Sequence, residues 1–424
     1  MAKIRRFNPL PRGLIKGLRR IAIALFTLWL VIFLWQAPVV YPGLDRGDRN
    51  VATDIRGIWM TDAASALMYT STRLDEVVAN LADHHLNTLY PAVWDRGYTL
   101  YPNTVTEEAG GKRRDPLLAL PLLPFQDALA GLVHQAHRQH LRLIPWFEYG
   151  FIIPASAAIA MAHPDWLTTN QAGETVLNPL EPDERLPRSL QNLQLEMVGG
   201  NWAWLNPCHP EVQQFLIDLI VDVVKRYEVD GIQLDDHFGL PVELGYDPYT
   251  ITLYQQEHNG QSPPTDPTNA DWMAWRAAHI TALFSRIATA VRSVNPDTII
   301  SLSPNPPTFA YQKYLQNWTY WAEQGWIDEV VVQIYRDTIE TFQQSLAQSK
   351  FAYLNQQIPV GIGLYTGPFA DAKPIDFITQ QVESIKSAGY QGVAIFSWET
   401  TLWLFKKSSE SSVLQAFYRL FPLP

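Results

Sequence analysis

The chain has very little cysteine and, beyond its N-terminus, little positive charge. Cys208 is the single thiol among 424 residues, so no disulfide can form within the chain. Residues 1–20 hold seven Lys or Arg and no acid. Because the net charge of the whole chain is −10, the residues that follow carry −17. A nucleic acid needs a basic surface, so we do not expect one as a partner.

Two common catalytic motifs are also missing. No GxGxxG follows the first apolar strand, which continues as WMTDAASA from Trp59. A doubly wound open sheet that binds a dinucleotide is therefore a weaker prediction than the barrel fold described below. No GxSxG surrounds Ser301 or Ser303, and no histidine partner for either is evident, so a serine hydrolase is not predicted.

Long apolar runs are rare, and the one present lies close to the N-terminus. Residues 21–37 contain no charge and follow the basic segment RGLIKGLRR. With Val39 and Val40 the run approaches the roughly 20 residues that cross a bilayer, whereas a signal peptide has a shorter apolar region and a small-x-small site. We predict a basic cytoplasmic segment at residues 1–20, a transmembrane signal anchor at 21–40, or alternatively a signal peptide, and a linker at 41–50. In both cases the rest of the chain is exported, as a membrane-anchored protein of the periplasm or cell envelope or as a secreted one.

Residues 51–424 alternate short apolar runs with longer amphipathic segments, which predicts a parallel sheet covered by helices. The eight runs that read as strands are residues 55–62, 87–94, 141–147, 230–235, 298–303, 329–335, 359–365 and 392–398. The segments that read as helices are 73–84, 124–139, 210–227, 271–295, 311–324, 338–348 and 374–388. This order predicts an α/β fold, a (β/α)8 TIM barrel with insertions, since such barrels typically have about 250 residues. The longest insertion, residues 152–206, is predicted to form a hairpin and flap beside the mouth.

Polar and aromatic side chains gather at the predicted C-terminal ends of the strands, where the active sites of such barrels lie. The candidates for substrate binding are Trp59, Asp62, Trp94, Trp146, Tyr149, Asn206, His237, Asn305, Gln333, Tyr335, Arg336 and Trp398. Acids and amides can hydrogen-bond to sugar hydroxyls, and aromatic rings can cover the apolar faces of sugars. The composition of this rim therefore predicts a glycan ligand.

The stretch VDGIQLDDHFG places two adjacent carboxyl groups at the end of the fourth predicted strand. Side-chain alternation predicts that Asp235 points into the barrel mouth, while Asp236 is a second carboxylate or an orienting partner. Glycosidic bonds are cleaved by two carboxyl groups, one acting as acid and the other as nucleophile or base. We assign the role of nucleophile or base to Asp235. We assign the role of acid to Glu148 or Glu399, because each follows a Trp and apolar neighbours raise a carboxyl pKa. Spacing does not choose between the two glutamates.

Two other classes of function stay open at this stage. A metal hydrolase such as a polysaccharide deacetylase could use Asp235, Asp236 and His237 as ligands. Adjacent residues on an extended strand point in different directions, however, and such a site would need further histidines. We therefore predict no metal and no cofactor. A barrel that binds glycans without cleaving them would keep the aromatic rim residues and lack activity.

Several longer motifs carry a resemblance to a known family. RGIWMT, PWFEYGF, HPDWLTTNQAGE, WLNPCHPEV, VDGIQLDDHFG and EVVVQIYRD, in this order, resemble the bacterial glycosyl-hydrolase-like 10 family over about residues 55–398. The resemblance implies a TIM barrel, an envelope location and hydrolysis of peptidoglycan or another envelope polysaccharide. The family's fourth strand matches Asp235 and Asp236, and its sixth resembles Gln333, Tyr335 and Arg336. Asn305 stands where alpha-amylases, which share the fourth-strand aspartate, have an acid.

Overall fold

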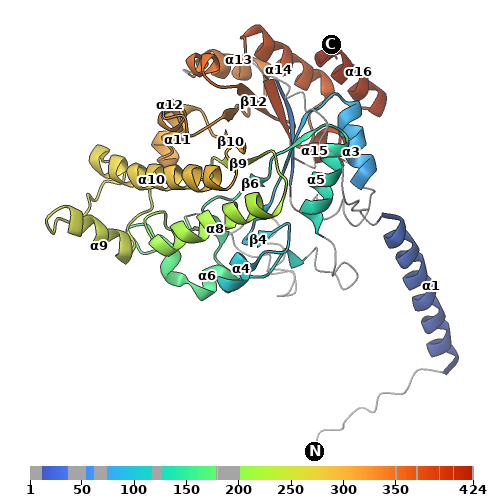
Figure 1. Ribbon diagram of the computed structural model, residues 1–424, viewed down its shortest axis with the longest axis horizontal. Coiled ribbons are helices and arrows are strands. Elements are labelled where there is room, and N and C mark those ends of the chain that lie inside the picture. Colours follow the sequence, from blue (N-terminus) through green and yellow to red (C-terminus); the bar gives the residue numbers. More distant parts are fainter. Residues whose placement is uncertain are drawn as a thin grey trace, which may run out of the picture.

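The structure is a computed structural model that describes most of the chain. The described residues are 12–36, 54–61, 74–116, 127–177, 179, 201–348, 351–368, 371–390, 392–403 and 405–422. Helix α1 (Arg12–Gln36) extends away from the sheet and its helices (Figure 1). None of the described helices has the length and apolar character needed to span a membrane. The anchor predicted at residues 21–40 is thus unsupported, and residues 1–11 and 37–53, which include the predicted linker, lie outside the described residues.

A parallel sheet forms the centre of the molecule and confirms the predicted sheet type. Its hydrogen-bonded order is β5-β2-β1-β13-β12-β11-β10-β9-β6. The strands are β1 (Ile55–Met60), β2 (Thr88–Pro91), β5 (Arg142–Leu143), β6 (Trp146–Phe147), β9 (Gly231–Asp235), β10 (Ile299–Ser303), β11 (Glu329–Gln333), β12 (Val360–Tyr365) and β13 (Gly392–Phe396). All pairings between these strands are parallel, so their C-terminal ends meet on one side.

Residues 142–147 join the two ends of this order. β5 pairs with β2 and β6 pairs with β9, although only Ile144 and Pro145 separate them. The backbone ladder continues across the break, because the N–H of Ile144 donates to Leu89 O (3.0 Å) and the N–H of Gln233 donates to Pro145 O (2.8 Å). Proline lacks an N–H and cannot complete the ladder, which explains the split of a strand predicted as continuous. This short segment therefore pairs with β2 through β5 and with β9 through β6.

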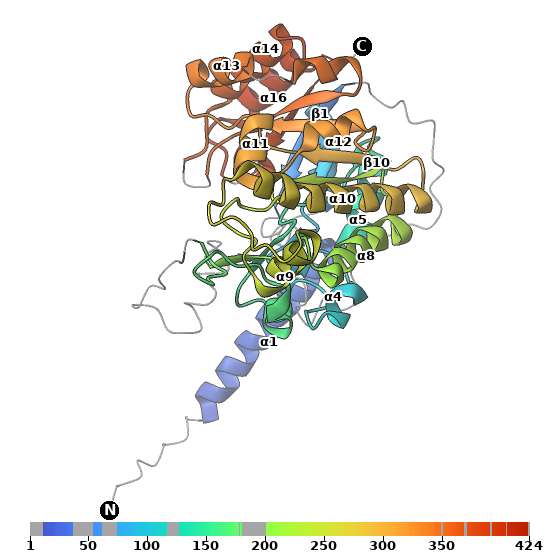
Figure 2. The same ribbon diagram turned by 90° about the vertical axis from the view of Figure 1, so that its left-hand side faces the viewer.

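Helices cover the outside of the sheet (Figures 1 and 2). The helices that connect successive strands or follow the last one are α3 (Leu74–Asp83), α5 (Ala128–Arg138), α8 (Pro210–Arg226), α10 (Ala270–Val294), α12 (Trp318–Glu323), α13 (Ile339–Gln348), α14 (Ile375–Ser387) and α16 (Glu410–Leu420). Neighbours such as α8 and α10, or α14 and α16, pack on each other. In α8 the predicted apolar stripe is buried, from Val212 to Val224, and Pro210 starts the helix at a position that needs no N–H.

The remaining elements lie in the connections. They are β3 (Trp94–Asp95) with β4 (Tyr98–Thr99), α4 (Thr104–Glu108), β7 (Ile152–Pro154) with β8 (Trp202–Trp204), α6 (Ala158–Ala162), α9 (Pro248–Glu257), α11 (Pro307–Tyr314), α15 (Trp398–Thr401), and 3-10 turns at Pro164–Trp166 and Ala352–Gln356. The antiparallel pair β7–β8 is the hairpin predicted in the 152–206 insertion. The helix predicted at 311–324 is instead two helices, because Leu315 takes a left-handed conformation (φ 55°) and ends α11. Trp94 was expected to end the second strand, but it belongs to the β3–β4 hairpin.

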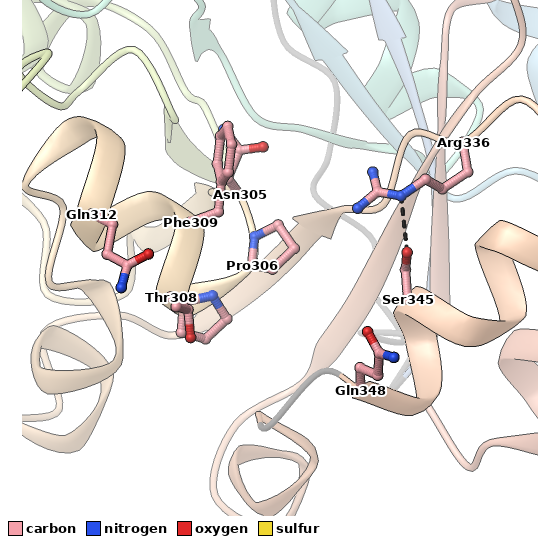
Figure 3. A pocket seen from close by; sticks show the side chains of 9 residues that line it. Asn305, Pro306, Thr308, Phe309, Gln312, Arg336, Ser345 and Gln348 are labelled. Atoms are coloured by element: carbon pink, nitrogen blue, oxygen red, sulfur yellow. Dashed lines mark hydrogen bonds between the residues drawn. The ribbon is translucent and has the colours of Figure 1, made fainter.

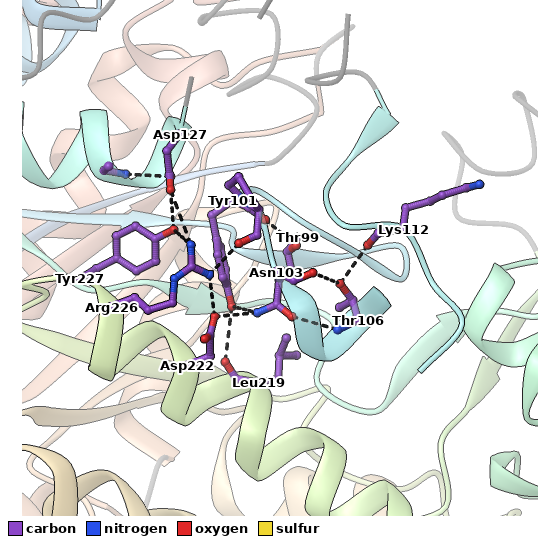
Figure 4. A network of polar contacts seen from close by, with 12 residues as sticks. Thr99, Tyr101, Asn103, Thr106, Lys112, Asp127, Leu219, Asp222, Arg226 and Tyr227 are labelled. Atoms are coloured by element: carbon purple, nitrogen blue, oxygen red, sulfur yellow. Dashed lines mark hydrogen bonds and ion pairs between the residues drawn. The ribbon is translucent and has the colours of Figure 1, made fainter. Parts of the chain in front are cut away.

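A polar network fastens the insertion after β2 to α8 (Figure 4). The carboxylate of Asp222 on α8 accepts hydrogen bonds from Asn103 (2.8 Å) and Arg226 (2.9 Å). The hydroxyl of Tyr227 donates to Asp127 (2.6 Å), which is the N-cap of α5. Charge-assisted hydrogen bonds of this kind hold a long connection against a helix.

The interior of the sheet is filled by aromatic rings and by polar groups that bond to one another. Trp59 is 5.5 Å from Tyr90 and 6.1 Å from Trp146, measured between ring centroids. The indole N–H of Trp59 donates to Oε1 of Gln233 (2.7 Å). This packing leaves the strand ends as the place where side chains can reach a ligand.

Candidate active site

Strand β9 delivers the two adjacent aspartates to the C-terminal side of the sheet. Its register with β10 sets Asp235 opposite Ser303 and Gly231 opposite Ile299. A Cβ on Gly231 would lie 2.5 Å from the carbonyl oxygen of Ile299, so the strand needs glycine there. After Asp235 the chain turns, and the N–H of Phe238 donates to Asp235 O (3.0 Å). The turn brings consecutive side chains together, which an extended strand would not do.

Asp235 is buried, with 2% of its surface exposed. Its Oδ1 accepts from the hydroxyl of Ser303 (2.7 Å) and from Nε2 of Gln333 (2.6 Å). Burial raises the pKa of Asp235 well above its usual range, and the nearby charge of Asp236 raises it further. Two carboxylates that share a site cannot both ionise easily, so Asp235 keeps its proton to a higher pH than an exposed aspartate does.

Asp236 is half-buried and is the more accessible member of the pair. Its Oδ2 accepts from Nδ2 of Asn305 (2.5 Å). Its Oδ1 lies 3.4 Å from Nε2 of Gln333, the same amide that bonds to Asp235. The predicted rim position of Asp236 therefore corresponds to a carboxyl group held by two side-chain amides and still open on one side.

His237 follows the pair and faces both carboxyl groups. Its Nδ1 is 2.9 Å from the carbonyl oxygen of Glu148 and 3.9 Å from Oδ2 of Asp235, and its Nε2 is 4.0 Å from Oδ1 of Asp236. One potential ligand atom from each of the three residues Asp235, Asp236 and His237 lies within 4.8 Å of the others. The expectation that neighbouring side chains would diverge is wrong here, because the chain turns at Asp235 instead of continuing as a strand.

The two candidate acids occupy different surroundings. Glu148 is half-buried beside this cluster, and its charge acts on the phenol of Tyr335 together with the charges of Asp235 and Asp236. Glu399 is fully buried, and its Oε1 accepts from the backbone N–H (2.9 Å) and the hydroxyl (3.2 Å) of Thr61 at the end of β1. Burial raises the pKa of Glu399, and its hydrogen bonds oppose this effect. Of the two, Glu148 is the glutamate that shares an electrostatic environment with the aspartate pair.

Tyr335 lies close enough to the cluster for its acids to act on the phenol. Its ring stacks on Phe396 and lies beside Tyr365, at centroid distances of 6.1 and 5.5 Å. Burial and the three acids raise the pKa of Tyr335 well above its usual range. The phenol therefore stays protonated at neutral pH and can donate a hydrogen bond.

Several residues predicted to bind substrate lie elsewhere. Trp59, Trp94, Trp146 and Trp398 are core residues with at most 3% of their surface exposed. Asn206 is also buried, because its amide donates to Asp247 and to Thr250 (both 2.9 Å) and fastens the start of α9. Asp62 lies outside the described residues. Large aromatic residues at strand ends fill a barrel as readily as they line its mouth, so the sequence could not separate these cases.

Other residues of the site were not predicted. The hydroxyl of Ser303 donates to the carboxyl group of Asp235 (2.7 Å), and the side-chain amide of Gln316 donates to the backbone oxygen of Asp235 (2.9 Å). Trp202 on β8 lies 5.6 Å from Tyr149 and 6.1 Å from His237 between ring centroids, so the hairpin forms a wall of the site. Ser303 ends the fifth predicted strand and could have been found from that position. Gln316 and Trp202 come from connections whose path the sequence does not reveal.

The parallel sheet and its outer helices form a barrel-like α/β fold, with carboxyl groups at the C-terminal edge of the sheet. Solved structures share this fold. The glycoside hydrolase domain of PgaB (BpsB) from Bordetella bronchiseptica has a TM-score of 0.54 at 13% identity, covering 81% of this chain and 94% of that one. The catalytic domain of the Paenibacillus polymyxa beta-amylase has a TM-score of 0.57 at 9% identity, covering 88% of this chain and 100% of that one.

The chain belongs to the glycosyl hydrolase-like 10 family, whose sequence pattern it matches over residues 54–382, and the resemblance noted above is thereby confirmed. It is 23% identical over 274 residues to the glycosyl hydrolase DigH of Escherichia coli K12, covering 59% of this chain and 54% of DigH. It is 22% identical over 228 residues to the glycosyl hydrolase YngK of Bacillus subtilis 168, covering 50% of this chain and 39% of YngK. The matches thus span about half or less of the length of these curated relatives.

Proposed function

We propose that this protein is a glycoside hydrolase that cleaves an envelope polysaccharide, such as the glycan strands of peptidoglycan, on a closed (β/α)8 barrel. Membership of a glycosyl hydrolase-like family supports the reaction class. The carrying observation is the pair Asp235 and Asp236, in which one amide contacts both carboxyl groups and only Asp236 is accessible. Burial raises the pKa of Asp235, so this residue can hold a proton beside an accessible carboxyl group.

The burial of the two aspartates guides the division of roles. Asp235 was predicted to be the nucleophile or base, but with 2% exposure it is better suited to positioning and to holding a proton. We assign to Asp236 the direct contact with the reacting sugar. Glu148 is then the second carboxyl group, since its charge reaches the same tyrosine as both aspartates. Glu399 is given a structural role at the end of β1, where it anchors Thr61.

The test is hydrolysis of purified envelope glycans, measured as the release of reducing ends. Asp236→Asn and Glu148→Gln are expected to lower kcat by about 100-fold or more, as general acid–base groups do, while glycan binding persists. Glu399→Gln is the matched control among buried acids, expected to retain activity if it folds. An Asp236→Asn variant as active as the parent would refute the assignment. A parent that binds glycans tightly and cleaves none of them would favour the non-catalytic glycan-binding barrel.

Export and membrane association are part of the proposal and rest on the sequence alone. Residues 1–20 are basic and residues 21–37 are apolar, as in a segment that directs the following domain across a membrane. Fusing a periplasmic reporter enzyme to the C-terminus checks the location. Loss of the apolar run from the mature protein would identify a signal peptide, and its retention an anchor. A fusion protein that is produced but stays in the cytoplasm with an inactive reporter would refute export.

A metal-dependent hydrolase, such as a deacetylase, is the second candidate, since possible ligand atoms of Asp235, Asp236 and His237 approach one another within 4.8 Å. In addition, a His whose Nδ1–H donates to a backbone carbonyl has an unprotonated Nε2 whose lone pair can coordinate a metal, and Glu148 provides that carbonyl for His237. Activity measured after exhaustive chelation separates the two candidates. Glycosidic cleavage that is unchanged by chelation excludes the metal route, whereas acetate release restored by added Zn²⁺ supports it.

A further inference from the structure

A cavity of about 460 Å³ opens next to the aspartate pair and plays no part in the mechanism above (Figure 3). One wall is the start of α11 with Asn305, Thr308 and Phe309, and the other is formed by Arg336 and by Gln348 of α13. Its volume falls within the roughly 300–1,000 Å³ of typical ligand sites. Neutral polar side chains and apolar ones share its lining, and Arg336 is the one charged group among the described residues that line it.

The side chain of Arg336 is held in place while part of its guanidinium stays open. Its Nε donates to the hydroxyl of Ser345 (2.8 Å) and its Nη1 to the backbone oxygen of Tyr335 (2.7 Å). Within the described part of the chain, Nη2 makes no hydrogen bond and no carboxylate forms an ion pair with this arginine. Figure 3 shows the guanidinium directed across the cavity toward Asn305 and Pro306. An oriented guanidinium of this kind matches a carboxylate, which it can bind through two parallel N–H groups.

The cavity is connected to the carboxyl pair through Asn305. The amide of Asn305 lines the cavity and donates to Asp236 (2.5 Å), so a ligand in the cavity would lie one side chain away from the reacting group. Phe309 has 46% of its surface exposed and lies on the same wall, where its ring can cover the apolar face of a sugar. A neighbouring sugar unit of the same chain therefore fits this position.

We propose that this cavity is a subsite for a sugar unit that bears a carboxylate, bound by Arg336 next to the unit whose bond is cleaved. This inference rests on the proposed glycosidase function and narrows its substrates to acidic glycans. The residues after position 20 carry a net negative charge, so an acidic glycan is repelled by the protein as a whole and needs a local cation to be held. The carboxylate source is a uronic acid or a lactyl ether, which share this chemistry.

Direct binding tests the subsite without relying on cleavage. The probes are a tetrasaccharide of alternating N-acetylglucosamine and glucuronic acid, the same tetrasaccharide with its carboxyl groups reduced to alcohols, and a peptide-free N-acetylglucosamine–N-acetylmuramic acid tetrasaccharide. We expect an acidic probe to bind the parent about tenfold or more tightly than the reduced one, the range for hydrogen bonds to charged groups. Which acidic probe binds better identifies the uronic acid or the lactyl ether as the ligand. Preference for the acid should weaken at high salt, because the site is partly exposed.

Variants make the assignment specific. Arg336→Gln should abolish the preference for the acidic probe and leave binding of the reduced probe unchanged. Arg286→Gln, a change to an exposed arginine of α10 that bonds to Gln213, is the matched control and should behave as the parent does. Equal affinity of the parent for acidic and reduced probes, or an undiminished preference in Arg336→Gln, would overturn the subsite. An acid preference that depends on Arg336 in a protein that cleaves none of the probes would instead refute the proposed hydrolysis and leave the subsite standing.

Discussion

The side-chain amide of Gln333 contacts both aspartates of the candidate site. Its Nε2 lies 2.6 Å from Oδ1 of Asp235 and 3.4 Å from Oδ1 of Asp236, and it also donates to the backbone oxygen of Ser303 (2.8 Å). An NH₂ group has two hydrogens, so three acceptors compete for them. The amide therefore couples the position and charge of the two carboxyl groups.

Replacing this amide should impair catalysis more than binding. We expect Gln333→Leu to lower kcat by roughly 10- to 100-fold with little change in KM, because the carboxyl groups lose a shared donor that fixes their orientation. The pH profile of kcat should shift as well, since the shared donor also acts on the charges of the pair. Gln214→Leu on the exposed face of α8 is the control. An unchanged pH profile in Gln333→Leu would mean that the amide does not act on the pair.

The raised pKa of Asp235 gives a second prediction, on stability. The native state holds the proton of Asp235 to a higher pH than the unfolded chain does. In an unfolded chain aspartate has a pKa of about 3.9. Stability of the parent should therefore fall as pH rises from the unfolded to the native pKa. Asp235→Asn keeps an oxygen acceptor and removes the charge, so it should have a higher Tm than the parent at pH 7 and lose this advantage near pH 3.

Thermal unfolding of both proteins between pH 3 and 8 measures this difference. Asp218→Asn, which changes an exposed aspartate of α8, is the control. The difference in Tm between this variant and the parent should be nearly constant across the same pH range. A destabilised Asp235→Asn variant at pH 7 would show that Asp235 is ionised in the native protein and stabilised by its donors, Ser303 and Gln333.

The periodicity of the sequence was sufficient to predict the parallel sheet and its helices. Each strand is a short apolar run, and the helix 210–227 carries one apolar stripe, so local pattern and global fold agree. The failures have local causes that periodicity does not report. Pro145 interrupts the third predicted strand, and Leu315, in a left-handed conformation, divides a predicted helix.

The candidate site was predictable only in part, for reasons that also lie in the chain. Asp236, Asn305 and Gln333 follow from their positions at strand ends and are found together. The choice between Glu148 and Glu399 needed burial and contacts, because the two motifs look alike in sequence. Trp202 was not predicted because an antiparallel hairpin of the insertion carries it to the site, and no strand-end rule applies to such a residue.

The wall formed by Trp202 supports a prediction on binding. The ring is partly exposed and borders Tyr149 and His237. We expect Trp202→Ala to raise KM by roughly 2- to 12-fold with a smaller effect on kcat, the range for loss of one aromatic contact. Trp202→Phe should restore most of the affinity. Trp275→Ala on α10, whose indole bonds to Glu257, is the control. A change in kcat alone would place Trp202 in a different role.

Arg276 on α10 determines the position of the loop that follows the aspartate pair. It is fully buried, and its guanidinium donates to the backbone oxygens of Val242 (2.6 Å), Leu244 and Pro267 (2.6 Å). Burial lowers the pKa of Arg276 to about 10, so the group is still charged at neutral pH. Arg276→Leu would leave these carbonyls without donors, and we expect it to lower the free energy of unfolding by about 3 kcal/mol or more. Urea denaturation measures this loss. Arg286→Leu, on the exposed face of the same helix, should cost less than about 0.5 kcal/mol; similar losses in the two variants would mean that the carbonyl contacts of Arg276 do not stabilise the loop.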